Sequence, residues 1–159
     1  LLAADFLNIG SEIERMAEAG ADYLHFDVMD GMFVPNISFG APIVKSLRPH
    51  SKMVFDTHLM ISEPHRYIED FAKAGSDIIT IHIECESDIG KTLDEIHALG
   101  KKAGLALNPD AELSRVLPYK DKIDILEECL VKAIEFPALR RHFFNHSLSL
   151  VRCGNPEKR

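Results

Sequence analysis

Residues 74–83 of this chain read Ala-Gly-Ser-Asp-Ile-Ile-Thr-Ile-His-Ile. Just before them, the apolar residues Ile68, Phe71 and Ala72 recur at helical spacing. Gly75 stands where a helix end needs a residue that tolerates positive φ. The apolar run that follows is typical of a short buried strand. The stretch therefore predicts a helix that ends at glycine and leads at once into a strand.

The same order recurs along the chain. Gly20 precedes the apolar run 23–28 and Gly100 precedes 103–107, while residues 47–50 lead into 53–60 without a glycine. Helix-then-strand units that recur roughly every 25 residues predict parallel strands joined by helical crossovers.

Two architectures fit this pattern: a doubly wound open sheet and a (β/α)8 barrel of the TIM type. An open sheet usually has a Gly-rich first turn at its nucleotide site. Residues 5–10, Asp-Phe-Leu-Asn-Ile-Gly, are not such a turn, so the barrel is favoured.

A complete barrel needs about 250 residues, whereas this chain has 159. Strands are expected at Leu1 (cut short) and near 23–28, 53–60, 78–83, 103–107 and 123–126. The prediction is an incomplete α/β barrel with about five to six of its eight βα units.

The composition limits the classes of function. An apolar fraction of 46% and a formal charge of −7 are typical of a globular protein and disfavour nucleic-acid binding. There is no apolar run long enough to span a membrane, and because the chain opens on Leu1-Leu2-Ala3 without a basic n-region, no signal peptide is expected. The three cysteines form no CxxC pair, which favours free thiols and a cytoplasmic location.

The charge changes sign late in the chain. Residues 1–135 carry 13 Lys/Arg and 24 Asp/Glu, whereas residues 136–159 carry five Lys/Arg and one Glu. The strand pattern lapses from about residue 127. We expect a partial barrel domain over 1–126 and a divergent tail over 127–159 that is disordered or non-native.

Polar side chains gather at the predicted strand ends, where a barrel builds its active site. His25 and Asp27 are two residues apart and share one face of a strand, and His58 lies near the end of the next strand. Two imidazoles and one carboxylate suit Zn²⁺, Fe²⁺, Mn²⁺ or Co²⁺. The residues alone leave a purely structural role open for each histidine. For His82 and Glu84, on the following strand, we expect hydrogen bonding beneath the site.

Residues 27–36, Asp-Val-Met-Asp-Gly-Met-Phe-Val-Pro-Asn, strongly resemble the signature of the ribulose-phosphate 3-epimerase family. As in that family, a His-x pair precedes the first Asp. The resemblance covers about residues 1–126 and includes 1–6, 58–61, 66–68 and 104–109.

The resemblance implies a barrel enzyme that interconverts D-ribulose 5-phosphate and D-xylulose 5-phosphate with one divalent metal ion. By position, His25, Asp27 and His58 match metal ligands, and Asp27 also matches a catalytic acid/base carboxylate. His58, Met29 and Met60 are expected to contact the sugar phosphate. The full-length family member is expected to be a homo-oligomer.

These residue types fit the chemistry. Inversion at C3 removes a proton beside the C2 ketone and returns one to the opposite face. The enediolate between these steps carries negative charge on oxygen, which a divalent metal stabilises. Two carboxylates, one on each face, would act as base and acid.

The chain departs from the family pattern after residues 123–126. The family continues with a Pro-Gly-Phe-Gly-Gly phosphate loop, whereas this chain continues Glu127-Glu128-Cys129-Leu130. The later strand that carries the second catalytic Asp, also the fourth ligand, has no match. We therefore expect a truncated, alternatively spliced or frameshifted product, or an incorrect gene model, and little or no epimerase activity from the chain as given.

Two other functions remain open. One is a sister epimerase that acts on allulose 6-phosphate, which residues outside the resemblance would help to distinguish. The other is a non-catalytic fragment that pairs with a full-length epimerase subunit.

Overall fold

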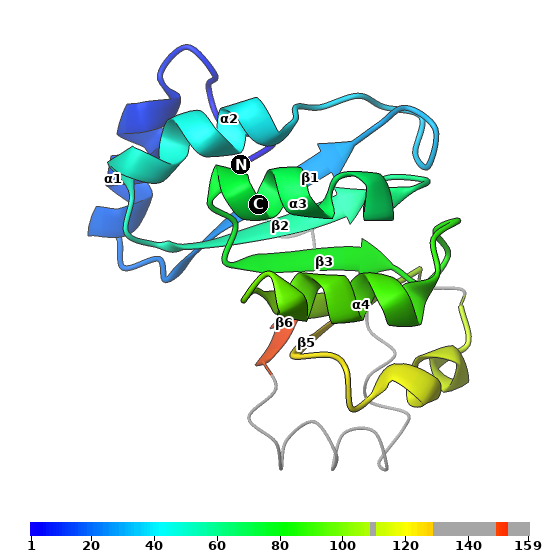
Figure 1. Cartoon of the computed structure of the whole chain (residues 1–159). Helices are drawn as coiled ribbons and strands as arrows, with labels where there is room; N and C mark the ends of the chain where they lie inside the picture. Colours follow the sequence, from blue (N-terminus) through cyan, green and yellow to red (C-terminus); the bar gives the residue numbers. More distant parts are fainter. Residues whose placement is uncertain (109–110, 129–148, 153–159) are drawn as a thin grey trace.

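The chain forms a parallel α/β sheet in a computed structural model that describes residues 1–108, 111–128 and 149–152 (Figure 1). The described strands pair in the order β1-β2-β3-β4-β5-β6, each with the next along the chain. The strands are β1 (Tyr23–Met29), β2 (Val54–Met60), β3 (Ile78–His82), β4 (Lys102–Leu107), β5 (Ile125–Glu128) and β6 (Ser149–Arg152).

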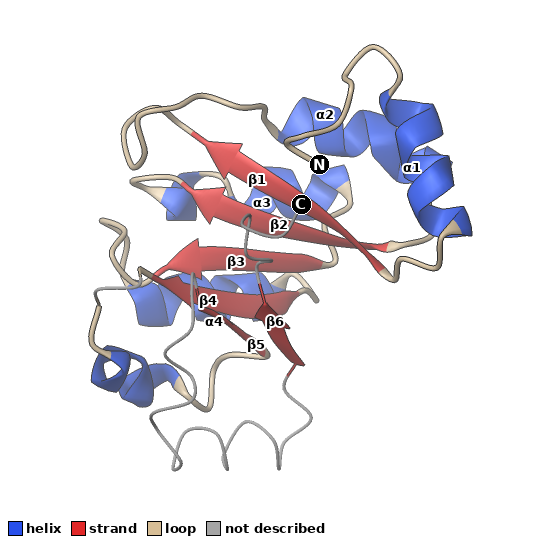
Figure 2. Cartoon of the chain, turned by 180° about the vertical axis from the view of Figure 1, so that it is seen from behind, coloured by secondary structure: helices blue, strands red, loops and turns tan. Residues whose placement is uncertain are grey.

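Helical segments connect these strands. They are α1 (Ile9–Glu18), α2 (Ala41–Leu47), α3 (Ile68–Ala74) and α4 (Ile89–Ala98), with 3₁₀ turns at η1 (Arg48–His50), η2 (Pro64–Arg66) and η3 (Leu113–Tyr119). Helices α2, α3 and α4 lie on the same face of the sheet, as the views from front and back show (Figures 1 and 2). A sequential parallel order with helices on one face is that of a barrel, because a doubly wound sheet reverses its order and has helices on both faces. The predicted incomplete barrel type is confirmed. None of the helices in the described ranges is long and apolar enough to cross a membrane.

The expected strands at 23–28, 53–60, 78–83, 103–107 and 123–126 all form, with ends shifted by a few residues. The strand expected at Leu1 is wrong. The residues before α1 form turns, and the amino group of Leu1 donates a hydrogen bond to the carbonyl of His25 at 2.8 Å. A stub of one or two residues has too few backbone groups to build a ladder.

Strand β6 was not anticipated from the sequence, since it lies in the basic segment without a clear strand period. Most of residues 127–159, including Cys129 and Cys153, lies outside the described residues. The expected boundary at residue 126 therefore stays a prediction. Cys85 is a free thiol, in agreement with the expectation for that cysteine.

Strand β1 presents its apolar residues to the helices and its polar residues to the opposite, inner face. Leu24, Phe26 and Val28 of β1 are buried in the core, and they alternate with the inner residues His25 and Asp27. The fully buried core continues through β2 to α4 with the side chains of Phe55, Leu59, Ile68, Ile79, Ile81, Leu93 and Ile96.

The sheet is strongly curved, with its inner face concave. In a flat sheet, β2 and β5 would lie about 14 Å apart, because neighbouring strands are spaced about 4.8 Å. Yet Nδ1 of His58 on β2 lies 3.3 Å from Oε2 of Glu127 on β5. Inner side chains three strands apart can meet only if the sheet bends around them, as in a barrel.

Gly104 on β4 permits this close approach. It pairs with Thr80 of β3, and a Cβ atom built on Gly104 would stand 2.1 Å from Thr80 Oγ1 and 3.1 Å from Thr80 Cα. The neighbouring inner residue on β4 is Ala106. Small residues on β4 therefore leave the inner face free for side chains from β3 and β5.

We expect Gly104→Ala to lower the free energy of unfolding by about 1–3 kcal/mol, the usual cost of overpacking a buried site. Urea denaturation would measure it. Gly10→Ala is a matched control, because a Cβ there meets nothing within 4 Å and alanine favours the helix. Equal stability of the Gly104→Ala variant and the parent chain would contradict this account of the curvature.

Candidate metal centre and its histidine network

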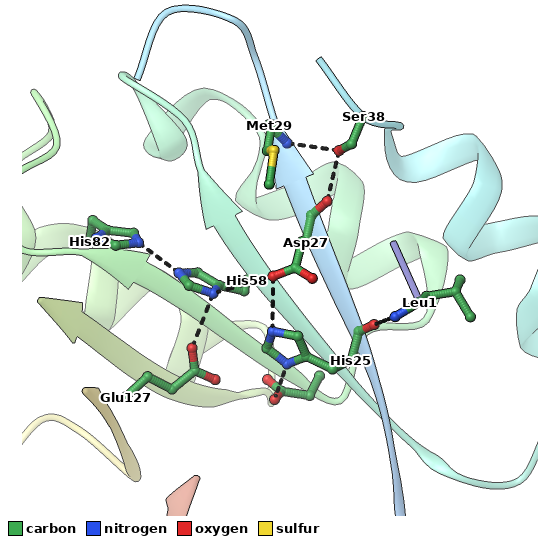
Figure 3. A network of polar contacts seen from close by, with 9 residues as sticks. Leu1, His25, Asp27, Met29, Ser38, His58, His82 and Glu127 are labelled. Atoms are coloured by element: carbon green, nitrogen blue, oxygen red, sulfur yellow. Dashed lines mark hydrogen bonds and ion pairs between the residues drawn. The ribbon is translucent and has the colours of Figure 1, made fainter. Parts of the chain in front are cut away.

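The register of β1 with β2 brings the predicted site residues together. Across this parallel pair, His25 lies opposite Asp56 and Asp27 opposite His58. Because paired residues point to the same face, all four side chains lie on the inner face of the sheet. Figure 3 shows His25, Asp27 and His58 pointing toward one another.

The three predicted ligands offer one compact donor set. Oδ1 of Asp27 lies 3.3 Å from Nε2 of His25 and 3.8 Å from Nδ1 of His58. One ligand atom from each residue lies within 4.8 Å of the other two. Nitrogen and carboxylate donors at these separations can share a single transition-metal or zinc ion.

Nδ1 of His25, the ring nitrogen that does not face Asp27, makes a hydrogen bond. It lies 2.9 Å from Oδ2 of Asp56, which is buried beneath it. A carboxylate accepts, so this Nδ1 carries a hydrogen. In the neutral imidazole, the lone pair is then on Nε2, which faces Asp27.

A chain of two hydrogen bonds, through His82 to Glu84, orients the ring of His58. Its Nε2 lies 2.7 Å from Nε2 of His82, and Nδ1 of His82 lies 3.3 Å from Oε2 of Glu84 (Figure 3 shows the first of these contacts). Since Glu84 accepts from Nδ1 of His82, the neutral His82 must accept at Nε2 and His58 must donate to it. The lone pair of His58 is therefore on Nδ1, which faces Asp27. The expected hydrogen-bonding role of His82 and Glu84 is confirmed.

The two ring nitrogens that face the centre make no well-formed hydrogen bond, although each lies 3.3 Å from a carboxylate oxygen. Nε2 of His25 and Nδ1 of His58 are buried and unpartnered within the described residues. Buried polar atoms are nearly always satisfied, and a metal ion would satisfy both. The chemistry and placement of these donors therefore fit a divalent cation.

The electrostatics of the cluster separate its histidines. Burial lowers the pKa of His58 to about 3, with His82 and His25 adding to the effect, and burial also lowers the pKa of His82. Burial opposes charge on His25 too, but the carboxylates of Asp27 and Asp56 outweigh it and raise the pKa of His25 to about 10. Burial alone would raise the pKa of Asp27, but His25 holds it below its ordinary value. Without a metal, the cluster pairs one imidazolium with ionised Asp27.

Sequence reasoning missed two members of this cluster. Asp56 could have been found, because it lies two residues before His58 and so shares its face. Glu127 was assigned to the divergent tail, and only the curvature of the sheet brings it to His58. Both carboxylates are buried, and with His25 they make a second group that could hold a metal ion.

The loop after β1 is held against the site by short hydrogen bonds. Ser38 Oγ donates to the carbonyl of Asp27 at 2.7 Å and accepts from the amide of Met29 at 3.0 Å (Figure 3). Asp30 accepts from the backbone amides of Phe33 and Ser62. These bonds tie the end of β1 to the end of β2.

Met29 and Met60 lie opposite each other at the last pair of the β1–β2 ladder. Both are partly buried, and Figure 3 shows Met29 beyond Asp27 along β1. They lie at the carboxyl ends of the strands, where the sequence placed them. Their contact with a substrate stays a prediction.

The raised pKa values predict how stability depends on pH. Burial and the charge of Asp56 raise the pKa of Glu127 to about 8, from an ordinary value of 4.5, while that of His25 rises from 6.5 to about 10. In both cases, the folded state holds a proton that the unfolded state releases at lower pH, so stability falls as pH rises. The two windows, 4.5–8 and 6.5–10, overlap between about pH 6.5 and 8.

With a chelator present, we expect the free energy of unfolding to fall across this overlap, with up to about 1.4 kcal/mol per pH unit from each group. Glu127→Gln should reduce the slope of the free energy of unfolding against pH by roughly half. Urea titrations at several pH values would measure it, with Glu14→Gln on the exposed face of α1 as the control. A slope unchanged by Glu127→Gln would contradict the placement of Glu127.

Comparison with known proteins gives one consistent answer. The model of the family described as "Ribulose-phosphate 3 epimerase family" matches residues 1–136. A ribulose-phosphate 3-epimerase from Synechocystis sp. is 52% identical over 131 residues, which are 79% of this chain and 57% of the relative. The cytoplasmic isoform from Oryza sativa is 42% identical over 136 residues, 85% of this chain and 60% of the relative.

The chain thus spans a little over half the length of these curated relatives. Among solved structures, the tryptophan synthase alpha subunit from Legionella pneumophila superposes with a TM-score of 0.56 at 13% identity. That alignment covers 91% of this chain and 65% of the other, and at such low identity it supports the fold alone.

Proposed function

The chain belongs to the ribulose-phosphate 3-epimerase family, and from that premise we propose that it binds a divalent metal ion and acts in the interconversion of D-ribulose 5-phosphate and D-xylulose 5-phosphate. The observation that carries the proposal is the convergence of two buried, unpartnered imidazole lone pairs on Asp27. Hydrogen-bond partners behind each ring aim these lone pairs at the centre.

The proposed ligands are His25 through Nε2, Asp27 through its carboxylate and His58 through Nδ1. Imidazole and carboxylate donors favour Zn²⁺, Fe²⁺, Mn²⁺ or Co²⁺ over Ca²⁺ or Mg²⁺. When bound, such an ion supplies Lewis-acid stabilisation of the negative charge that develops on the sugar oxygen as a proton leaves C3.

Asp27 is the proposed base. Its pKa lies below the ordinary value despite burial, so the carboxylate is ionised and able to accept the proton from C3 at neutral pH. Its side chain is about one quarter exposed, which leaves it accessible from the open side of the inner face. The β1–β2 ladder and Ser38 hold its backbone in place.

Met29 and Met60 are the proposed walls beside the reacting carbon. A thioether has no acidic proton and accepts hydrogen bonds only weakly. Side chains of this kind limit the access of water without competing with Asp27 for the proton.

A deuterium-exchange experiment tests the proton-abstraction step. In D₂O with Zn²⁺, Mn²⁺ or Co²⁺, we expect the chain to incorporate deuterium at C3 of ribulose 5-phosphate or xylulose 5-phosphate, followed by NMR. Asp27→Asn should slow this exchange about 10²-fold or more, the usual range for loss of a general base. Exchange needs one base on one face, so we expect it to exceed net epimerisation.

The control is His65→Asn, which alters an exposed histidine bonded to Ser87 outside the cluster. It should exchange as the parent does. Exchange that is absent from the parent chain, or equal in the Asp27→Asn variant, would reject the proposed role.

We further propose that the full-length family member is a homo-oligomer and that this protein is cytoplasmic. Leu7, Met32 and Ile37 are large apolar side chains that are mostly exposed, as at surfaces that become buried on assembly. Light scattering of the purified chain would test the oligomeric state. One relative is a cytoplasmic isoform and another is a chloroplastic enzyme.

A further inference from the structure

Glu127 is a buried carboxylate that none of the roles above uses. It stands on β5 opposite Ala106 of β4, and Ala106 stands opposite His82 of β3. Its side chain is only 2% exposed and points into the inner face toward His58 (Figure 3).

Both oxygens of Glu127 lack a hydrogen-bond partner in the described part of the chain. A buried carboxylate without hydrogen bonds is costly, and such groups are normally paired or bound to a metal. A proton or a cation would satisfy Glu127 in this environment.

A ring nitrogen of His58 that faces Glu127 is also without a hydrogen-bond partner among the described residues. Nδ1 of His58 lies 3.3 Å from Oε2 of Glu127 and 3.8 Å from Oδ1 of Asp27. Since His58 gives its hydrogen to His82 through Nε2, this Nδ1 offers a lone pair to both carboxylates. Three electron-rich atoms that face one another favour a positive charge between them.

Two of the separations match those of ligands that share one ion. Donor atoms bound tetrahedrally at about 2.1 Å lie about 3.4 Å apart. The contacts of 3.3 Å between Glu127 and His58 and between Asp27 and His25 are close to that value. Two carboxylates and two neutral imidazoles would also balance the charge of a divalent ion.

We propose that Glu127 is a further ligand of the divalent cation, so that in this chain a carboxylate from β5 joins His25, Asp27 and His58. The inference rests on the proposed function for the metal ion itself. Neither the sequence pattern nor the comparisons assign a role in the site to Glu127 or to strand β5.

An alternative set, made of His25, Asp56 and Glu127, is also compact, with one ligand atom from each within 4.8 Å of the others. It is less favourable for two reasons. Nδ1 of His25 would have to give up its 2.9 Å hydrogen bond to Asp56, and Nδ1 of His58 would remain unpartnered.

Cobalt binding to the 159-residue chain tests the inference. We expect Glu127→Gln and Glu127→Leu to weaken Co²⁺ affinity, measured by calorimetry, by at least about tenfold, the lower end of what loss of an outer partner costs. Asp56→Asn is the comparison for a supporting residue, since it removes a buried carboxylate that holds His25 from behind, and His65→Asn outside the cluster is the control.

Loss of a ligand and loss of a residue that supports a ligand can both weaken Co²⁺ affinity. The visible spectrum of the Co²⁺-saturated protein therefore shows whether Glu127 binds the ion directly. A ligand change alters the position and intensity of the absorption bands. We expect Glu127→Gln and Glu127→Leu to change them more than Asp56→Asn does, and His65→Asn, an exposed site outside the cluster, to leave them as in the parent. Glu127→Gln is isosteric and neutral, and near-UV circular dichroism would verify that it folds.

Two outcomes would overturn the inference in distinguishable ways. If His25→Asn abolishes Co²⁺ binding but both Glu127 variants keep the parent spectrum and affinity, Glu127 is not a ligand and the three-residue site stands. If His25→Asn binds Co²⁺ like the parent chain, the metal site of the proposed function fails, and the inference fails with it.

Discussion

The register of the β1–β2 pair is the constraint on which the rest of this structure depends. By placing Asp27 opposite His58 and His25 opposite Asp56, it puts two imidazoles and two carboxylates in one patch of the inner face. A shift of one residue would turn these side chains toward the helices and bring Phe26 and Leu24 to the site. The apolar residues that alternate with them enforce the register, since only this pairing buries Leu24, Phe26 and Val28 against the helices.

The curvature of the sheet converts this patch into a three-dimensional centre. Gly104 and Ala106 leave the inner face of β4 almost bare, and the sheet bends across them until side chains from β2 and β5 meet. Steric room on one strand thus determines which residues of two other strands become neighbours.

The polar network around the centre fixes the orientation of the His25 and His58 rings. Asp56 stands behind His25, and the pair His82–Glu84 stands behind His58. Hydrogen bonds of this kind fix ring orientation and tautomer in metal sites. The cost is a set of buried charges that compete for protons in the absence of a cation, as the raised pKa values of His25 and Glu127 show. Binding of the proposed metal ion would therefore release protons from this cluster.

The sequence by itself determined the helix–strand repeat, the barrel type, the family and the candidate ligands on β1 and β2, because these depend on local spacing and on a continuous motif. Gly75, with φ of 108° at the end of α3, is the residue that the repeat requires at that point. Asp56 was within reach of the same spacing argument and was overlooked. The tertiary structure alone decided the position of Glu127, the direction of the His58 lone pair and the formation of β6. Each of these depends on contacts between residues far apart in the sequence, which a curved sheet creates and a local pattern does not contain.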